Sequence, residues 1–390
     1  MTMKAEELIN TFFEKYGNRA EEPVLFFAPG RVNLIGEHTD YNGGYVFPCA
    51  LNYGTYLALR KTNNNAVKFS TLNFSSDASA RLGGLFKNTF KSWINYPLGV
   101  MNEFIKQGTE LTGMELQYWG DVPNGAGLSS SASIEMVTAV ALNESFNAGF
   151  QTVDLVKMAQ RAENEFVGMN CGIMDQFAAG FGMINHAIFL NCDTLEYENV
   201  PLKLEGCSLI ITNTNKRRGL TDSKYNERRS ECEKAVEYLQ KYRKIRNLGN
   251  MNTGELDILK DYIPDEVVRR RAHHVISENG RVLEAVQVLK SNNLERFGEL
   301  MNQSHDSLKD DYEVTGFELD TLVYEGRKLP GVLGSRMTGA GFGGCTVSLV
   351  KDEFRDRFIA DLAGIYIKKT GLVPDFYQPE VGQGAGRIKI

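Results

Sequence analysis

The sequence has 390 residues, of which 42% are hydrophobic and 24% are charged, and this composition is typical of globular proteins. Its length favours two domains over one hydrophobic core, and such a chain buries enough apolar surface to fold without disulfides or structural metals. The formal net charge of −6 argues against nucleic acid or an anionic membrane as the main partner, because both require a basic surface.

The cysteine pattern and the N-terminus bear on the compartment. The cysteines are scattered, without a C-x-x-C pair, so the sequence predicts neither a disulfide framework nor a structural zinc site. The N-terminus lacks the apolar run of a signal peptide, and no apolar stretch is long enough to span a membrane. We therefore expect a reduced, cytoplasmic protein that binds no membrane. We also expect a monomer, although the sequence leaves an oligomer open.

The first half of the chain reads mainly as strands. Strands are predicted at residues 24–28, 45–51, 54–60 and 114–119, from apolar runs or from alternation with a period of two. Residues 133–146 are apolar nearly all round, which predicts a buried helix. Residues 154–167 predict an amphipathic helix with Thr152 as its cap and Gly168 as its stop.

The second half has a different texture. Long charged helical patterns dominate from about residue 225 to 327. A strand, a glycine-rich turn and a second strand follow Pro330, and then a helix at 354–367 and an extended stretch at 372–377. Strands and helices at that spacing indicate an α+β domain. We place the domain boundary near residue 205, which gives domains 1–205 and 206–390.

A loop rich in glycine and serine joins the predicted strand 114–119 to the buried helix. Its residues are Gly125, Ala126, Gly127, Leu128, Ser129, Ser130 and Ser131. Glycines let the backbone approach a ligand closely, serines supply hydroxyl groups, and the start of the following helix favours an anion. The pattern therefore indicates a phosphate site, and an ordinary helix start capped by serine is the alternative. The loop has no lysine and is not a Walker A motif.

Residues 339–344 satisfy the pattern G-x-G-x-x-G. A dinucleotide-binding fold requires a helix after this pattern, but the residues that follow, 345–350, read as a strand. We therefore reject a dinucleotide site. The small residues of this segment instead indicate close backbone approach, either against the other domain or along a ligand.

A polar loop at residues 30–44 lies between two apolar runs. Its polar residues are Arg31, Asn33, Glu37, His38, Asp40 and Asn42. A carboxylate–imidazole–carboxylate run suits a polyol, because each carboxylate can accept hydrogen bonds from two neighbouring hydroxyls. A solvated hairpin loop and a metal site are the alternatives.

Taken together, these segments resemble a known family. Residues 28–44 resemble the galactokinase signature, and residues 123–133 and 337–345 resemble the second and third motifs of the GHMP kinases (galacto-, homoserine, mevalonate and phosphomevalonate kinases). The first motif is the more specific, and the three occur in family order across nearly the whole chain. The resemblance implies an enzyme that transfers the γ-phosphate of ATP to the anomeric hydroxyl of galactose, giving galactose 1-phosphate and ADP.

The same resemblance implies a fold. It is the α+β, two-domain fold of the GHMP kinases, with an N-terminal domain like domain 2 of ribosomal protein S5 and a ferredoxin-like C-terminal domain. The active site would lie in the cleft between the two domains.

The resemblance also implies roles for individual residues. Asp175, in the segment 172–176, matches the base that acts on the anomeric hydroxyl, and Arg31 matches the group that stabilises charge. The implied sugar-binding residues are Glu37, His38, Thr39, Asp40, Gly172, Asp175 and Tyr225.

ATP and Mg²⁺ are implied at the serine-rich loop. The residues 125–131 would hold the nucleotide phosphates and Trp93 would lie near the adenine, where core packing is the alternative explanation. Ser131 and Glu163 match the family's magnesium ligands, and an exposed glutamate at a helix seam is the alternative for Glu163. The basic run 216–218 is either a solvated charge cluster or a phosphate contact.

Two other functions stay open at this point. The first is a kinase of the same superfamily that acts on a related substrate such as N-acetylgalactosamine. The second is a non-catalytic sensor of galactose and ATP. In a sensor we would expect damage to the serine loop, and residues 129–133 are intact here.

Overall fold

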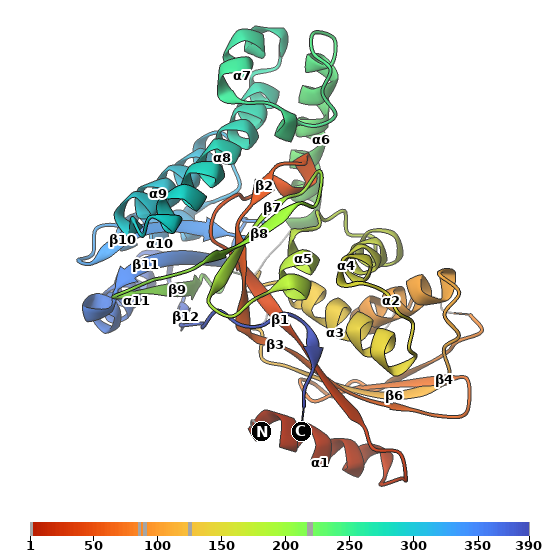
Figure 1. Ribbon diagram of the computed structural model, residues 1–390. Coiled ribbons are helices and arrows are strands. Elements are labelled where there is room, and N and C mark those ends of the chain that lie inside the picture. The colour runs from red at the N-terminus through yellow and green to blue at the C-terminus, as the bar shows by residue number, and fades with distance from the viewer. Residues whose placement is uncertain (1–2, 85–86, 89–91, 124–126, 217–220, 390) are drawn as a thin grey trace.

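The structure is a computed structural model that describes residues 3–84, 87–88, 92–123, 127–216 and 221–389 (Figure 1). Its helices are α1 (Met3–Tyr16), α2 (Asn95–Lys106), α3 (Ser130–Ser145), α4 (Thr152–Arg161), α5 (Met174–Phe181), α6 (Thr221–Leu239), α7 (Thr253–Leu259), α8 (Glu266–Lys290), α9 (Leu294–Asp310), α10 (Phe317–Gly326) and α11 (Arg355–Thr370). Its strands are β1 (Val24–Asn33), β2 (Tyr45–Val46), β3 (Pro48–Lys61), β4 (Ala66–Thr71), β5 (Ala78–Arg81), β6 (Met114–Gly120), β7 (His186–Asn191), β8 (Tyr197–Pro201), β9 (Cys207–Asn213), β10 (Val332–Thr338), β11 (Cys345–Lys351), β12 (Asp375–Tyr377) and β13 (Gly386–Arg387).

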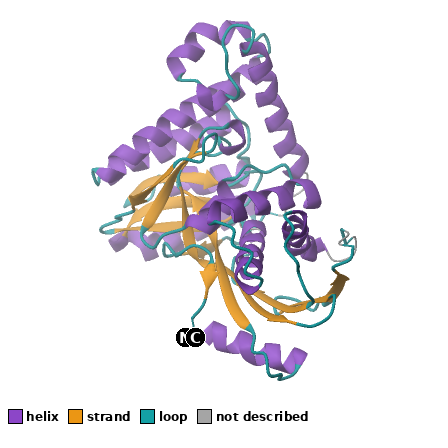
Figure 2. Cartoon of the chain, turned by 45° about the vertical axis from the view of Figure 1, so that its right-hand side comes forward, coloured by secondary structure: helices purple, strands orange, loops and turns teal. Residues whose placement is uncertain are grey.

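The N-terminal half is built on a sheet with the strand order β13-β1-β3-β6-β4-β5. Helices α2 to α5 cover one face of this sheet, and α1 lies against the other (Figures 1 and 2). The side chains of successive residues of β3 point to opposite faces of the sheet. Leu57 packs in the core under α3, whereas Tyr56 and Ala58 pack under α1. This alternation follows from the strand period of two.

Strand β1 continues beyond its predicted end at residue 28 and reaches Asn33, so the first part of the predicted polar loop is strand. Its pairing with β3 shifts register between Pro29 and Arg31. At this point β1 approaches the serine-rich loop, and the Arg31 amide donates to the Leu128 carbonyl over 3.1 Å. A Cβ atom on Gly30 would lie 2.6 Å from the same carbonyl oxygen, so the close approach requires glycine.

Two of the predicted helices have the expected positions but different ends. The buried helix is α3, which begins at Ser130, three residues earlier than predicted. The predicted amphipathic helix is α4 followed by a π-helical turn, η3 (Ala162–Val167), which ends at Gly168 as expected. Thr152 is not the cap of α4. Gln151 occupies that position, and its side chain and that of Asp154 form a capping box.

The C-terminal half contains a sheet with the order β10-β11-β9-β12, and a small sheet, β2-β7-β8, belongs to the region between the halves. Helix α7 and the adjoining ends of α6 and α8 project away from the sheets (Figure 1), whereas the C-terminal half of α8 packs on β2 and β8. The strand β11 directly follows the segment 339–344, which confirms that this segment is not a dinucleotide motif. The predicted α+β class of this half is likewise confirmed.

The chain crosses between the halves more than once. Strand β9 belongs to the C-terminal sheet, whereas the tail strand β13 returns to the N-terminal sheet, where Phe26 pairs with Arg387 and Phe27 with Gly386. The boundary near residue 205 stays a prediction. No helix within the described ranges is long and apolar enough to cross a membrane.

Candidate active site

A pocket, here called the central pocket, is lined by residues from both halves of the chain. The residues that line it are Arg31, Glu37, His38, Asp40, Tyr41, Glu163, Met169, Asn170, Cys171, Gly172, Met174, Asp175, Tyr225, Asn226, Gly339 and Ala340. They come from segments that lie far apart in the sequence. The structure therefore brings together most of the residues that the resemblance implies to be catalytic or sugar-binding, together with Glu163.

Arg31 and Asp175 form a two-point ion pair in this pocket. Nε and Nη2 of Arg31 donate to the two carboxylate oxygens of Asp175, each over 2.8 Å, and Nη1 donates to the Gly127 carbonyl over 2.8 Å. Asp175 lies in the first turn of α5, where the helix dipole favours a negative charge. These contacts fix the orientation of both side chains and join the central pocket to the serine-rich loop.

Ser129 takes part in this arrangement and does not cap its helix. It occupies the N-cap position of α3 with a φ of 62° and makes no side-chain capping bond. Its hydroxyl instead donates to the Asp175 carboxylate. The alternative explanation of the loop as an ordinary serine-capped helix start therefore does not describe Ser129.

Glu37 is held by groups from both halves of the chain. Asn33 Nδ2 donates to one of its carboxylate oxygens over 3.0 Å, and the Gly339 amide donates to the other over 2.9 Å. Its backbone is fixed from helix α8, because the Gly36 amide donates to the buried Glu278 carboxylate over 2.9 Å. The neighbouring Arg281 and other positive groups lower the pKa of Glu278 to about 2, although its burial acts in the opposite direction.

Asp40 and Gly172 are in close contact. A Cβ atom at position 172 would lie 1.9 Å from an Asp40 carboxylate oxygen, so only glycine leaves room for this carboxylate. Burial and the negative charges of Asp175 and Glu37 together raise the pKa of Asp40 to about 7, although Arg31 acts in the opposite direction. Four carboxylates, those of Glu37, Asp40, Glu163 and Asp175, thus share one pocket with a single arginine among its lining residues.

We expect Asp40→Asn to stabilise the ligand-free protein at pH 8. Because the pKa of Asp40 is higher in the folded protein than in the unfolded chain, its contribution to stability is lost as the pH rises toward about 7. The variant cannot ionise, so its melting temperature should exceed that of the wild type by roughly a few degrees at pH 8 and by about half as much at pH 5.5.

Thermal unfolding at the two pH values measures this effect. Asp257→Asn, which changes an aspartate with 72% of its side chain exposed, is the control and should show no such gain. An Asp40→Asn variant that melts below the wild type at pH 8 would contradict the prediction.

His38 is neutral and buried beside aromatic rings. Burial lowers the pKa of His38 to about 3. Its Nδ1 lies 2.8 Å from the Tyr41 hydroxyl, and its ring packs against Tyr225 of α6 with centroids 5.7 Å apart. Thr39 is different, because its hydroxyl lies 2.8 Å from the Gly36 carbonyl and 2.6 Å from the Tyr45 carbonyl, and it is not among the residues described as lining the pocket.

A second pocket lies beside the serine-rich loop. It is lined by Thr55, Thr71, Asn73, Phe74, Trp93, Tyr96, Tyr118, Gly120, Val122, Ser130, Ser131 and Ile134. The Trp93 ring makes edge contacts with Phe74 and Tyr118, and its Nε1 donates to the Ser76 hydroxyl over 3.2 Å. Aromatic side chains line one part of this pocket, and Ser130 and Ser131 in the first turn of α3 line another.

Not every residue named in the sequence analysis is among the described residues. Gly125 and Ala126 are outside the described residues, as are Arg217 and Arg218. Within the described part of the basic run, Lys216 forms an ion pair with Glu318 over 2.7 Å. This pairing favours the structural explanation for Lys216.

Glu163 belongs to a buried acidic group that sequence reasoning only partly identified. Its pKa is raised by burial and by the negative charge of Asp175, and its carboxylate accepts a hydrogen bond from Ser131. Gln176 Nε2 donates to Glu163 over 2.6 Å and to the fully buried Glu135 over 3.0 Å. Glu135 gave no signal in the sequence beyond its place on an apolar helix, whereas Gln176 ends the segment 172–176 that resembles the family but was given no role. The described residues contain no cluster of three or more His, Cys, Asp or Glu side chains arranged to hold a metal.

Comparison with known proteins identifies the family. Residues 10–61 match the galactokinase galactose-binding signature, residues 95–183 the N-terminal domain of the GHMP kinases and residues 285–363 their C-terminal domain. The galactokinase of Clostridium acetobutylicum is 51% identical over 387 residues, which cover 98% of this chain and 100% of that protein. This chain belongs to the galactokinases. The galactokinase of Bacillus subtilis is 50% identical over 387 residues and covers similar shares, 98% and 99%.

Solved structures agree with this assignment. The crystal structure of Lactococcus lactis galactokinase complexed with galactose has a TM-score of 0.96 and 43% identity, and covers 99% of this chain and 100% of that one. The mevalonate kinase of Methanococcus jannaschii, at 19% identity and a TM-score of 0.67 over 94% of this chain and 100% of that one, shares the fold. The predicted two-domain GHMP kinase fold is confirmed, and the chain is an ATP-dependent sugar kinase.

Proposed function

We propose that this kinase phosphorylates galactose at the anomeric hydroxyl, with ATP as the phosphoryl donor and galactose 1-phosphate and ADP as products. The observation that carries the proposal is the two-point Arg31–Asp175 pair, which lies where the central pocket meets the serine-rich loop. The likeness to a galactokinase that was crystallised with galactose supports the choice of sugar.

Asp175 is the proposed base of the reaction. The anomeric oxygen forms a bond to the γ-phosphorus as the bond from that phosphorus to the β,γ-bridging oxygen breaks and ADP leaves. The hydroxyl proton passes to the Asp175 carboxylate. Arg31 holds this carboxylate at two points and stabilises negative charge on the transferred group. The third hydrogen bond of Arg31, to the Gly127 carbonyl, fixes the position of the proposed sugar site relative to the serine-rich loop.

The proposed sugar contacts come from the central pocket. Glu37, Asp40 and His38 offer acceptors and donors to the sugar hydroxyls, and Tyr225 closes the pocket from α6. Gly172 contributes by leaving room for the Asp40 carboxylate. Thr39 supports the loop through its contacts with backbone carbonyls rather than by lining the pocket.

The proposed nucleotide site is the second pocket together with the loop 127–131. The start of α3 presents backbone N–H groups to phosphates, and Trp93 offers an aromatic face or edge to the adenine. The residues Ser131 and Glu163 fit a magnesium site, because a buried carboxylate with a raised pKa lies beside a hydroxyl and near Asp175. Magnesium, when bound, would neutralise charge on the nucleotide phosphates.

Gly172→Ala is expected to raise the galactose KM at least about 10-fold, because the new methyl group forces the Asp40 carboxylate out of its position. The ATP KM should stay within about twofold. Steady-state kinetics with each substrate varied in turn measures both values. Gly364→Ala in α11, where a Cβ meets nothing within 4 Å, is the matched control and should leave the galactose KM unchanged. An unaltered galactose KM in Gly172→Ala would contradict this account of the Asp40–Gly172 contact.

A coupled assay of ADP release across a panel of substrates tests the function as a whole. We expect turnover with galactose to exceed turnover with N-acetylgalactosamine and with mevalonate. Faster turnover of either alternative would overturn the choice of substrate. Binding of galactose without ADP release above background would instead identify a sensor.

A further inference from the structure

We propose that Tyr312 is a positioning residue that fixes the orientation of His38 in the central pocket, acting through the hydroxyl of Tyr41. The inference rests on the proposed function, because it assigns His38 to the binding of the sugar. Tyr312 itself is fully buried and is not among the described residues that line the pocket, whereas His38 and Tyr41 are.

A chain of hydroxyl contacts joins the three residues. The Tyr312 hydroxyl lies 2.9 Å from the Tyr41 hydroxyl, and the Tyr41 hydroxyl lies 2.8 Å from His38 Nδ1. At the end of this chain of contacts away from His38, the Tyr312 hydroxyl lies 3.0 Å from Cys232 Sγ in α6. The rings pack as well, because the Tyr312 centroid is 4.9 Å from that of His38. Tyr312 thus supports His38 from behind, by packing and through a hydrogen-bonded neighbour.

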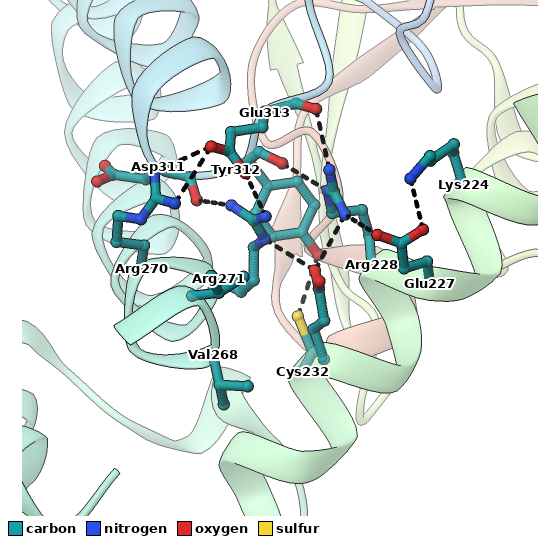
Figure 3. A network of polar contacts seen from close by, with 12 residues as sticks. Lys224, Glu227, Arg228, Cys232, Val268, Arg270, Arg271, Asp311, Tyr312 and Glu313 are labelled. Carbon is teal, nitrogen blue, oxygen red and sulfur yellow. Dashed lines mark hydrogen bonds and ion pairs between the residues drawn. The ribbon is translucent and has the colours of Figure 1, made fainter. Parts of the chain in front are cut away.

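Two arginines hold the segment that carries Tyr312 (Figure 3). Arg271 of α8 donates to the Asp311 carbonyl over 2.6 Å. Arg228 of α6 donates to the Tyr312 carbonyl over 2.7 Å and to the Glu313 carbonyl over 3.2 Å. Three consecutive carbonyl groups therefore accept hydrogen bonds from guanidinium groups, which are rigid, multivalent donors.

The arginines are in turn tied to each other. Glu231 of α6 accepts from Arg271 over 2.8 Å and from Arg228 over 3.2 Å, and Glu313 accepts from Arg271 over 2.5 Å. Glu313 has a φ of 55°, a left-handed conformation that a non-glycine residue adopts only where its surroundings hold it. These hydrogen bonds and ion pairs therefore fix the backbone conformation of the segment that contains Tyr312.

The consequence for the sugar site lies in the imidazole ring of His38. In a neutral imidazole one nitrogen donates and the other accepts, and the partner of one nitrogen determines the role of the other. Nδ1 is engaged by Tyr41, so Nε2 is the ring nitrogen left for a ligand. The Ala340 backbone lies near the ring, but among the described residues Nε2 has no partner of good hydrogen-bond geometry. Removal of the Tyr312 hydroxyl frees the Tyr41 hydroxyl to turn away and leaves the His38 ring less well oriented.

Tyr312→Phe tests this role, because it keeps the ring and removes the hydroxyl. We expect the galactose KM to rise about 3- to 10-fold, with kcat and the ATP KM within about twofold of the wild type. Tyr366→Phe is the matched control, because Tyr366 is also fully buried and its hydroxyl donates to the Thr214 carbonyl over 2.8 Å, in a different part of the C-terminal half. A purely structural role would lower the melting temperature of both variants and leave the galactose KM unchanged.

A double-mutant cycle with Tyr41→Phe identifies the route. If Tyr312 acts through the Tyr41 hydroxyl, Tyr312→Phe should change the galactose KM by less than about twofold in the Tyr41→Phe background. If the two changes multiply in their effects on the galactose KM, or if Tyr312→Phe leaves the galactose KM unchanged, the inference is overturned. In either case, turnover of galactose by the wild-type enzyme would still uphold the proposed function. If Tyr312→Phe does not fold, an unchanged galactose KM in Tyr41→Phe alone overturns the inference. A wild-type protein that neither binds nor phosphorylates galactose overturns both proposals.

Discussion

Asp175→Ala is expected to reduce kcat for galactose phosphorylation by about 10²- to 10⁴-fold, the usual contribution of a positioned general base. The change removes the acceptor of the hydroxyl proton and the partner that holds Arg31 at two points. Nucleotide affinity should stay largely intact, because the lost carboxylate lines the central pocket and is not among the residues that line the proposed nucleotide pocket. ADP release gives kcat, and calorimetric titration with ATP in the absence of sugar gives the affinity.

The control for this prediction is Asp356→Asn, which changes an aspartate with 84% of its side chain exposed and should leave both measurements unchanged. Asp175→Asn is an informative companion, because the amide keeps the shape of the side chain but cannot take up the proton. Loss of ATP affinity with retained turnover in Asp175→Ala would argue against the proposed role.

Arg31→Lys should lower kcat by about 10²- to 10³-fold, although the positive charge is retained. A lysine has a single ammonium group and cannot contact both Asp175 oxygens and the Gly127 carbonyl in the geometry of a guanidinium. Because the carboxylate keeps a cation nearby, we expect most of the loss in kcat and little of it in the galactose KM.

Arg60→Lys provides a matched control for this experiment. Arg60 is also fully buried, pairs with Glu115 through two nitrogens and donates to the carbonyls of Tyr16 and Gly17, away from both pockets. This control should lower the melting temperature and leave kcat unchanged. An Arg31→Lys enzyme with wild-type kcat would show that the two-point geometry is not needed for the reaction.

Much of the fold could be predicted from local patterns. The alternation at residues 114–119 predicts β6, and the strand character of residues 345–350 was enough to reject a dinucleotide site. The predictions were wrong where pairing with distant segments decides the outcome. Strand β1 extends to Asn33 because β3 pairs with it past a register shift, and no pattern within residues 30–33 indicates this.

The site could be predicted only in part, and for a similar reason. The resemblance drew attention to Arg31 and Asp175, which lie 144 positions apart and meet in the structure. Tyr312 and Glu278 are ordinary members of a loop and a helix in the sequence. Their contacts with the polar loop 30–44 appear only when α8 and the segment after α9 are packed against it. Residues that act through a neighbour leave no local signal in the sequence, because their role depends on a contact with a residue far away in the chain.

The return of the tail strand β13 to the first sheet limits how the protein can be divided. A recombinant fragment that stops at residue 205 would lack β13 and would expose the backbone edge of β1 along Phe26 and Phe27. Free strand edges pair readily with other chains, so we expect such a fragment to self-associate. Its complement, residues 206–390, carries the missing strand. The two fragments should therefore form a soluble complex when they are produced together, whereas neither fragment should be soluble when it is produced alone.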